Sequence, residues 1–265
     1  MRLKPKKNLG QNFLSDKNIL AKIINACGLT PEDTVLEIGS GRGELTKFIA
    51  PSVKHLTALE IDTSLCEQLE GSLKEYKNSE IINCDVLKFN FKKYFRSAKI
   101  KRLKVIGNIP YYITTPIIEE LLKHRKKIEV VFFTVQKEFA DRIAARPGSK
   151  TFGSLSCFIQ YYAEPEKLFL IKRNSFFPSP KVDSCLLRLK IRNKPAIKVR
   201  DEKFFFSIIR AAFNKRRKTL RNSLREIYPS EKLTQFFAKY SITPNTRPEC
   251  LSLEDFANLS NLQKT

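Results

Sequence analysis

Glycine occupies every second position of the loop Gly39–Gly43, which follows a short apolar run and precedes a stretch with helical spacing. Glycine tolerates positive φ angles and lets a ligand lie close to the backbone, so Gly39 and Gly41 are candidate ligand-binding residues. A dinucleotide fingerprint would need a small residue where this chain has Glu44 or Thr46. The loop therefore favours a cofactor without a pyrophosphate, with a ligand-free glycine turn as the simpler alternative.

Two acidic residues, Glu60 and Asp85, come at the ends of the next two predicted strands. Glu60 is about twenty residues beyond the glycine loop, where an acidic side chain binds ribose hydroxyls in open α/β sheets. A carboxylate at Asp85 can accept a hydrogen bond from an adenine amino group. Each acid alone would be an ordinary surface residue, but with the loop they predict an adenosine ligand without phosphates. S-adenosylmethionine is such a ligand.

An alternation of strands and helices must position these residues. Apolar runs predict strands at residues 35–38, 56–60, 80–84, 104–107, 130–135 and 186–191. Helical spacing predicts helices at residues 16–27, 45–50, 65–76, 116–124, 204–228, 232–240 and 253–259. The predicted fold is therefore α/β, with a parallel, Rossmann-like sheet domain at residues 1–192 and a small helical domain at residues 193–265.

The cysteines and apolar runs point to a cytoplasmic protein without a metal. No two of the six cysteines are three residues apart, and only His55 and His124 could complete a metal site. The basic N-terminus has no apolar run after it, so it is not a signal peptide. The longest apolar stretch, residues 130–135, is too short to span a bilayer, and we expect no membrane partner.

The chain carries 49 Lys and Arg residues against 27 Asp and Glu residues, a formal charge of +22. So basic a chain usually binds a polyanion, first nucleic acid and second an anionic membrane surface, although it could simply be cationic. Residues 210–225 contain seven basic residues and no acidic one. If they form one helix, Phe213, Leu220 and Leu224 share its packed face. The expected phosphate-binding residues are Arg210, Lys215, Arg217, Lys218, Arg221 and Arg225, unless this is only a solvated face.

A second basic stretch, residues 88–104, contains eight basic residues and no acid, with aromatic residues between them. It could form a second nucleic-acid contact beside residues 210–225. It could equally be a solvated loop whose aromatic side chains pack inward. The sequence leaves both alternatives open.

The sequence Asn-Ile-Pro-Tyr at Asn108–Tyr111 would, by itself, be read as a turn after a strand. It resembles the catalytic motif of methyltransferases that act on the amino groups of bases. With Gln11–Leu14, Phe176–Ser184, Arg210–Asn222 and Leu251–Phe256 in this order, the chain resembles the ribosomal RNA adenine N6,N6-dimethyltransferase family. The run Arg210–Asn222 is similar to the bacterial small-subunit branch.

This resemblance implies catalytic roles for the motif. Asn108, with the backbone carbonyl of Ile109 or Pro110, would accept the two N–H bonds of the adenine amino group and aim its lone pair at the methyl group. Pro110 would fix the turn, and Tyr111 would stack on the base. No histidine or metal is required. Asn108 is also expected to contact the cofactor.

The flanking motifs imply further site residues. Asn12 and Leu14 match positions that close over the cofactor. Phe176 matches a second base-stacking residue, although the adjacent Phe177 could take that role if the register differs by one. One of these two phenylalanines is expected to pack in the core.

The implied reaction is dimethylation of two adjacent adenines near the 3′ end of small-subunit ribosomal RNA by S-adenosylmethionine, with the 30S particle as partner and no obligate protein partner. One alternative is a large-subunit adenine methyltransferase of the antibiotic-resistance type, which shares residues 108–111. Another is a non-catalytic ribosome-assembly factor. The basic run at residues 210–222 favours the small-subunit branch, and the intact catalytic motif favours an enzyme.

Overall fold

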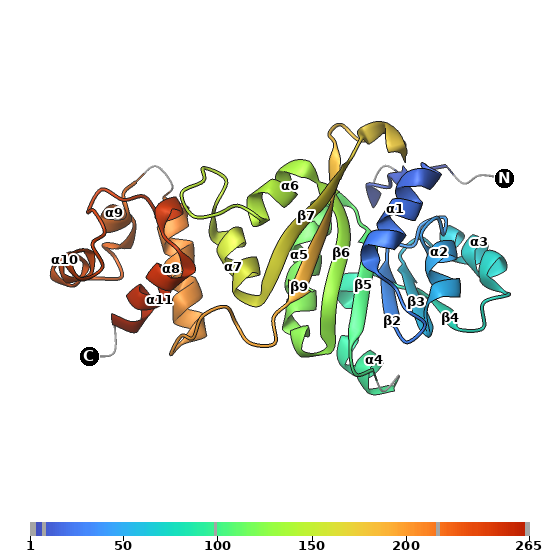
Figure 1. Cartoon of the computed structure of the whole chain (residues 1–265), viewed down its shortest axis with the longest axis horizontal. Helices are drawn as coiled ribbons and strands as arrows, with labels where there is room; N and C mark the ends of the chain where they lie inside the picture. Colours follow the sequence, from blue (N-terminus) through green and yellow to red (C-terminus); the bar gives the residue numbers. More distant parts are fainter. Residues whose placement is uncertain (1–3, 7–8, 98–99, 216–217, 263–265) are drawn as a thin grey trace. The chain divides into compact units, whose positions relative to one another are not determined.

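The structure is a computed structural model that describes residues 4–6, 9–97, 100–215 and 218–262. The chain divides into two compact units. The first consists of Met1–Ala140 and Glu166–Ile191, and the second consists of Asp141–Pro165 and Arg192–Thr265. Figure 1 labels the elements of both units along the chain.

A seven-stranded sheet forms the centre of the first unit, in the order β4-β3-β2-β5-β6-β9-β7. The strands are β2 (Thr34–Ile38), β3 (His55–Glu60), β4 (Ser79–Asn83), β5 (Leu103–Asn108), β6 (Ile128–Gln136), β7 (Ala163–Ile171) and β9 (Ser184–Ile191). The first five strands in this order pair in parallel, and β9 pairs antiparallel with β6. The predicted Rossmann-like α/β fold is confirmed.

Six of these strands match the strands predicted from the sequence, and β7 was not predicted. Pro165 lies inside β7 and removes a backbone donor, which is tolerated because β7 is at the edge of the sheet. A second, two-stranded sheet was also missed. It pairs β1 (Phe13–Leu14) antiparallel with β8 (Phe176–Phe177), and two-residue strands are too short to produce a periodic pattern.

Helices of the first unit cover the sheet. They are α1 (Lys17–Cys27), α2 (Thr46–Ile49), α3 (Thr63–Leu73), α4 (Phe91–Ser97) and α5 (Thr114–Lys123), and α6 (Lys137–Ile143) begins in this unit. Leu20 of α1, Ile49 of α2 and Leu69 of α3 share one apolar cluster with Val35 and Ile106 of the sheet. The side chains on the opposite face of these strands are buried too, as expected of a sheet covered on both faces.

The basic stretch at residues 88–104 includes a helix, α4, that sequence analysis did not predict. Its aromatic side chains Phe91, Tyr94 and Phe95 are buried. The Phe91 ring stacks on His124 with centroids 5.1 Å apart. The alternative in which these aromatics pack inward is therefore the one that the structure supports.

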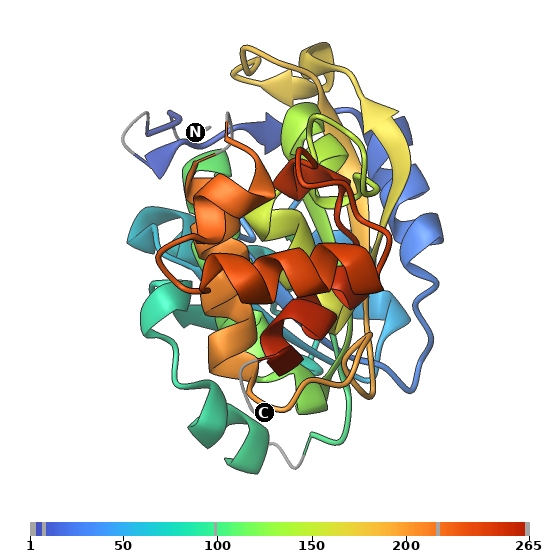
Figure 2. The same cartoon turned by 90° about the vertical axis from the view of Figure 1, so that its left-hand side faces the viewer.

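The second unit contains α7 (Ser154–Tyr162), α8 (Glu202–Asn214), α9 (Leu220–Leu224), α10 (Ser230–Lys239) and α11 (Leu253–Asn261). Helix α8 contacts α7, α9 and α11; the C-terminal helices are orange to red in Figure 2. Short 3-10 turns complete the two units: η2 (Ala50–Ser52), η3 (Val86–Lys88), η4 (Tyr111–Ile113), η5 (Arg125–Lys127), η6 (Arg173–Ser175) and η7 (Pro248–Cys250).

Two expectations about this region need correction. Residues 141–165 were placed in the sheet domain, but the ring of Tyr161 packs on Phe205 at 5.2 Å, which joins this stretch to the second unit. One helix was expected over residues 204–228, but α8 ends at Asn214 and α9 begins at Leu220 with Thr219 as its N-cap. Most apolar side chains of both helices are buried, as those on one face of a single continuous helix would be.

Candidate functional site

A pocket that is open to solvent lies in the first unit, where the parallel strands β2, β3, β4 and β5 end. This is the edge at which open α/β sheets bind ligands. The pocket brings together nine of the predicted site residues: Asn12, Leu14, Gly39, Gly41, Glu60, Asp85, Asn108, Pro110 and Tyr111.

The glycine loop takes the left-handed backbone conformation that the sequence predicted. Gly39 and Gly41 have φ angles of 73° and 58°. A Cβ atom on Gly41 would lie 3.2 Å from the ring of Phe13, so the loop also needs the space that glycine leaves. These features bring the loop backbone to the wall of the pocket.

Glu60 ends β3 and supports the same loop. Its Oε2 accepts a hydrogen bond from Gly41 N at 2.8 Å, and its Oε1 accepts one from Asp62 N at 2.9 Å. Burial raises the pKa of Glu60, and these backbone donors act against that rise. The carboxylate is thus fixed at the pocket wall before any ligand is considered.

Asp85 follows β4 and lines the pocket from the neighbouring strand. Its Oδ1 caps η3 by accepting a hydrogen bond from Leu87 N at 2.9 Å. This bond uses one oxygen and leaves Oδ2 as an acceptor for a ligand.

Asn108 is the last residue of β5 and contacts the N-terminal segment, residues 9–14. Its Nδ2 donates to the carbonyl oxygen of Asn12 at 2.8 Å, and no described residue hydrogen-bonds to its Oδ1. The Tyr111 hydroxyl shares a 2.6 Å hydrogen bond with Ser184, which holds its half-buried ring. Burial raises the pKa of Tyr111, against the opposing effect of that hydrogen bond, so the phenol stays neutral near pH 7.

Glu37 is a pocket residue that sequence reasoning missed. It is fully buried in β2, two residues before Gly39, and its Oε2 has no hydrogen-bond partner among the described residues. Burial raises its pKa to about 8. The sequence did contain a signal for Glu37, because an acid inside an otherwise apolar strand is rare unless the acid has a partner.

Two apolar pocket residues were missed as well. Ile61 follows Glu60 and is half exposed, and Val86 follows Asp85 on the next strand end. An apolar residue beside a strand-end acid offers a surface for an aromatic ring. No sequence signal separated these residues from the core.

The two phenylalanines of the motif after β7 differ in exposure. Phe176 is 4% exposed and belongs to the same apolar cluster as Leu14, whereas Phe177 is 56% exposed. Phe177 pairs with Phe13, and the Arg42 guanidinium carbon lies 4.1 Å from the Phe13 ring and 6.0 Å from the Phe177 ring. Neither phenylalanine is part of the pocket wall. The stacking role implied for Phe176 stays a prediction, and the greater exposure of Phe177 makes it the alternative.

The predicted RNA-binding residues lie in the second unit, except that Arg217 lies outside the described residues. Arg210, Lys218 and Arg225 are exposed, and their side chains make no hydrogen bond or ion pair with a described residue. Lys215 forms an ion pair with Glu226 at 2.7 Å. Arg221 donates to Thr234 Oγ1 at 3.0 Å.

The described part of the chain offers no other kind of site of the types considered next, a metal centre or a membrane span. No group of three or more His, Cys, Asp or Glu residues there could hold a metal ion. Within the same residues, every helix is too short or too polar to cross a membrane. The pocket fits S-adenosylmethionine, because it joins a glycine-lined backbone, acids at two strand ends and a buried carboxyl oxygen that lacks a partner.

A sheet of this order with its pocket at the strand ends defines a Rossmann-like methyltransferase that uses S-adenosylmethionine. Residues 2–264 match the family model described as ribosomal RNA adenine dimethylase, and the chain therefore belongs to that family.

Relatives and solved structures are similar over nearly the whole chain. Ribosomal RNA small subunit methyltransferase A of Caldanaerobacter subterraneus is 45% identical over 264 residues, 98% of this chain and 97% of the relative. The protein of that name from Geobacillus is 44% identical over 97% of this chain and 90% of its own length.

Two crystal structures have the same fold. A dimethyladenosine transferase from Plasmodium falciparum matches with a TM-score of 0.79 and 26% identity, over 94% of this chain and 95% of its own. The 23S rRNA methyltransferase ErmE matches with a TM-score of 0.77 and 26% identity, over 96% of this chain and all of its own.

Proposed function

We propose that this enzyme dimethylates the N6 amino groups of two adjacent adenines near the 3′ end of small-subunit ribosomal RNA, in the cytoplasm during ribosome biogenesis, with the 30S particle as substrate. The observation that carries the chemistry is the hydrogen bond from Asn108 Nδ2 to Asn12 O. It fixes the amide so that Oδ1 is left to accept a hydrogen bond from an amino group.

The chain's own residues then supply positioning rather than proton transfer. The adenine amino nitrogen is a poor nucleophile because its lone pair is delocalised into the ring. Asn108 Oδ1 accepts a hydrogen bond from one N–H of this amino group, and the backbone carbonyl of Ile109 or Pro110 accepts one from the other; Pro110 O already accepts a bond from Ile113 N at 3.2 Å, which leaves it one lone pair. These two acceptors favour a pyramidal nitrogen, and Tyr111 supports the base by stacking. S-adenosylmethionine, when bound, would supply the electrophilic methyl group: the new N–C bond would replace the S–C bond, S-adenosylhomocysteine would leave, and the amino nitrogen would release its proton to solvent.

The cofactor contacts follow from the pocket. Glu60 binds the ribose hydroxyls, Asp85 Oδ2 accepts a hydrogen bond from the adenine amino group of the cofactor, and Gly39 and Gly41 line its path. Asn12 and Leu14 cover it from the N-terminal segment. The cations of the second unit bind RNA phosphates: the exposed Arg210, Lys215, Lys218 and Arg225, the partly buried Arg221, and Arg217 in the same basic run.

The substrate is tested by transfer of tritiated methyl groups to undermethylated 30S particles and, separately, to protein-free large-subunit RNA. We expect methylation of adenines in the 30S particles. Activity confined to large-subunit RNA would show the antibiotic-resistance type instead. Binding of 30S particles with no methyl transfer to either RNA would show an assembly factor.

The stacking phenylalanine is tested in the same assay. Phe177→Ala should reduce methyl transfer without lowering Tm, because the exposed ring contributes little to the core. Phe176→Ala should lower Tm, since truncating a buried phenylalanine costs about 3–5 kcal/mol. A loss of activity only in Phe176→Ala, measured well below its Tm, would restore the role that the sequence motif implied.

A further inference from the structure

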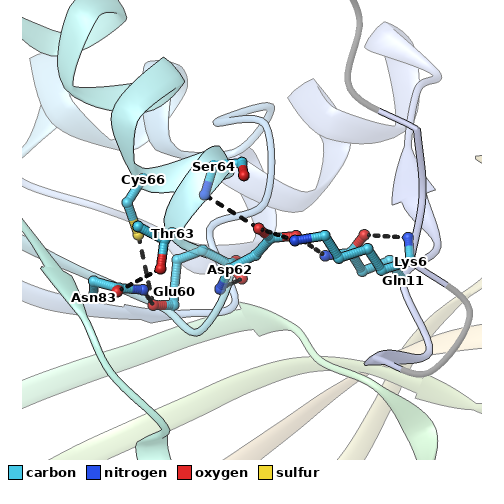
Figure 3. Close-up of polar contacts among 8 residues, drawn as sticks. All are labelled: Lys6, Gln11, Glu60, Asp62, Thr63, Ser64, Cys66 and Asn83. Atoms are coloured by element: carbon cyan, nitrogen blue, oxygen red, sulfur yellow. Dashed lines mark hydrogen bonds and ion pairs between the residues drawn. The ribbon is translucent and has the colours of Figure 1, made fainter.

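The loop after β3 holds an acidic residue, Asp62, that none of the site assignments includes. Its side chain is 3% exposed and faces the N-terminal segment, which we define as residues 9–14. Lys6 Nζ lies 2.7 Å from Asp62 Oδ1, and Gln11 Nε2 donates to Asp62 Oδ2 at 3.1 Å. Figure 3 shows both side chains directed at this carboxylate.

The partners of Asp62 are themselves linked. Lys6 N donates to Gln11 Oε1 at 2.8 Å, so the two residues and the carboxylate form a closed set of hydrogen bonds. Burial would raise the pKa of Asp62, but the bonds from Lys6 and Gln11 outweigh it and hold the pKa below its usual value. The carboxylate is therefore ionised at neutral pH, and bonds to a charged acceptor are stronger than neutral ones.

Asp62 sits on a rigid support. The carbonyl oxygen of Glu60 accepts hydrogen bonds from Asn83 Nδ2 and Cys84 N, both at 2.9 Å, which ties the end of β3 to the end of β4 (Figure 3). Asp62 also caps α3 by accepting a hydrogen bond from Ser64 N at 3.2 Å. An anchor fixed in this way can restrain the start of the segment, residues 9–11, which precedes the contact of Asn12 with Asn108 and the pairing of β1 with β8.

The other end of the N-terminal segment meets the catalytic motif. Asn12 O accepts the hydrogen bond of Asn108. Gly10, with a φ angle of 61°, lies so close to Tyr112 that a Cβ atom would be 3.1 Å from that ring. The segment thus runs between Asp62, beyond β3, and Asn108, at the end of β5, and its residues line the cofactor pocket.

We propose that Asp62 is a positioning residue that holds the N-terminal segment across the cofactor pocket through Lys6 and Gln11. Without this anchor the segment is held only from Asn12 onward, and the part of the pocket wall formed by residues 9–11 loses its fixed position. The expected consequence is faster cofactor release. This inference concerns the cofactor and does not depend on which RNA is methylated.

The test uses S-adenosylhomocysteine and S-adenosylmethionine as probes and needs no RNA. Asp62→Asn keeps an acceptor for Ser64 N but loses the charge, and Lys6→Met removes the partner at a half-exposed site. We expect each variant to bind both probes about tenfold more weakly, the change that about 1.4 kcal/mol produces. The tritiated cofactor should dissociate faster by a similar factor. In methyl transfer, KM for the cofactor should rise while kcat at saturation changes less than threefold.

Three controls separate positioning from folding. Lys4→Met makes the same change at an exposed lysine of the same terminus, and Asp201→Asn makes the same change at the N-cap of α8 in the other unit. Neither should alter cofactor affinity. The double variant Lys6→Met, Asp62→Asn should bind no more weakly than Asp62→Asn alone, because both changes break one interaction.

Two results would overturn the proposal. One is a Lys6→Met protein that binds S-adenosylhomocysteine as tightly as Lys4→Met. The other is an Asp62→Asn protein with a lower Tm but unchanged cofactor dissociation, which would reduce Asp62 to a helix cap.

Discussion

The cofactor pocket of the first unit and the basic surface of the second unit hold their functional atoms in opposite ways. In the pocket, Glu60 and Asn108 are each fixed by hydrogen bonds to the backbone of a distant segment. On the basic surface, Arg210 and Lys218 are exposed, and their side chains have no hydrogen-bond partner among the described residues. A transferring methyl group requires exact geometry, whereas a phosphate backbone can be bound by mobile cations.

This difference predicts how each region responds to change. Pocket residues act together, so losing one should produce a large effect on a single step. Surface cations act nearly independently, so each should contribute a small, salt-dependent part of RNA affinity. The following variants test that contrast, from the largest expected effect to the smallest.

Replacing Asn108 with Ala should reduce kcat by about 100-fold to 1000-fold, the usual cost of removing one fixed hydrogen-bonding group from a transition state. RNA affinity should stay the same. Single-turnover methyl transfer measures the effect, with the exposed Asn18→Ala of α1 as control. A loss of less than tenfold would mean that the amide does not accept the amino N–H.

Replacing Glu60 with Gln should weaken cofactor binding about tenfold or more, because a neutral amide is a poorer acceptor for ribose hydroxyls. Isothermal titration with S-adenosylhomocysteine measures it. Glu67→Gln, an exposed site on α3, is the matched control and should bind normally. If both variants bind equally well, Glu60 only supports the glycine loop.

Replacing Glu37 with Gln should change how stability depends on pH. The buried carboxyl has a pKa of about 8 in the folded chain and about 4.5 when unfolded. Between these values the unfolded chain releases a proton that the folded chain keeps, so stability falls as pH rises and stops falling above about pH 8. The variant lacks this loss, and its Tm should exceed that of the wild type by several degrees more at pH 8 than at pH 5. Calorimetry at both pH values measures these Tm differences, with Glu67→Gln as control. A difference between Glu37→Gln and the wild type that is the same at both pH values would contradict the raised pKa of Glu37.

Replacing Arg210 or Lys218 with Glu should weaken RNA binding only about twofold to tenfold and lower the salt slope by about one for each lost phosphate contact. Filter binding across a salt series measures both quantities. Lys203→Glu on α8 makes the same charge change outside the basic run. If all three variants weaken RNA binding equally, RNA affinity depends only on net charge. Cofactor affinity should be unchanged in all three variants.

Much of the first unit was predictable because its signals are local. The apolar strand runs, the glycine loop and the acids Glu60 and Asp85 at the ends of β3 and β4 were each predicted from a few neighbouring residues. The pocket brings the loop and these acids together as expected. Features that depend on distant contacts were not predictable. The break after Asn214 was hidden because Phe213 and Leu220 keep helical spacing although they belong to different helices.

The site shows the same limit at the level of single residues. Motif spacing predicted Asn108 and Tyr111 as site residues, and both line the pocket, but the burial of Phe176 depends on its pairing with Leu14, far away in the chain. Asp62 gave no signal because a lone acid after a strand is common. Its role depends on Lys6 and Gln11, which only the folded chain brings close.

The pairing of β1 with β8 also sets an order of events during synthesis. Phe13 is synthesised 164 residues before its partner, Phe177. Until then the N-terminal segment has Asp62 and Asn108 to contact but no neighbouring strand. The wall of the cofactor pocket is therefore completed late, so a nascent or truncated chain that ends before β8 would hold its cofactor poorly, even with every residue that lines the pocket already in place.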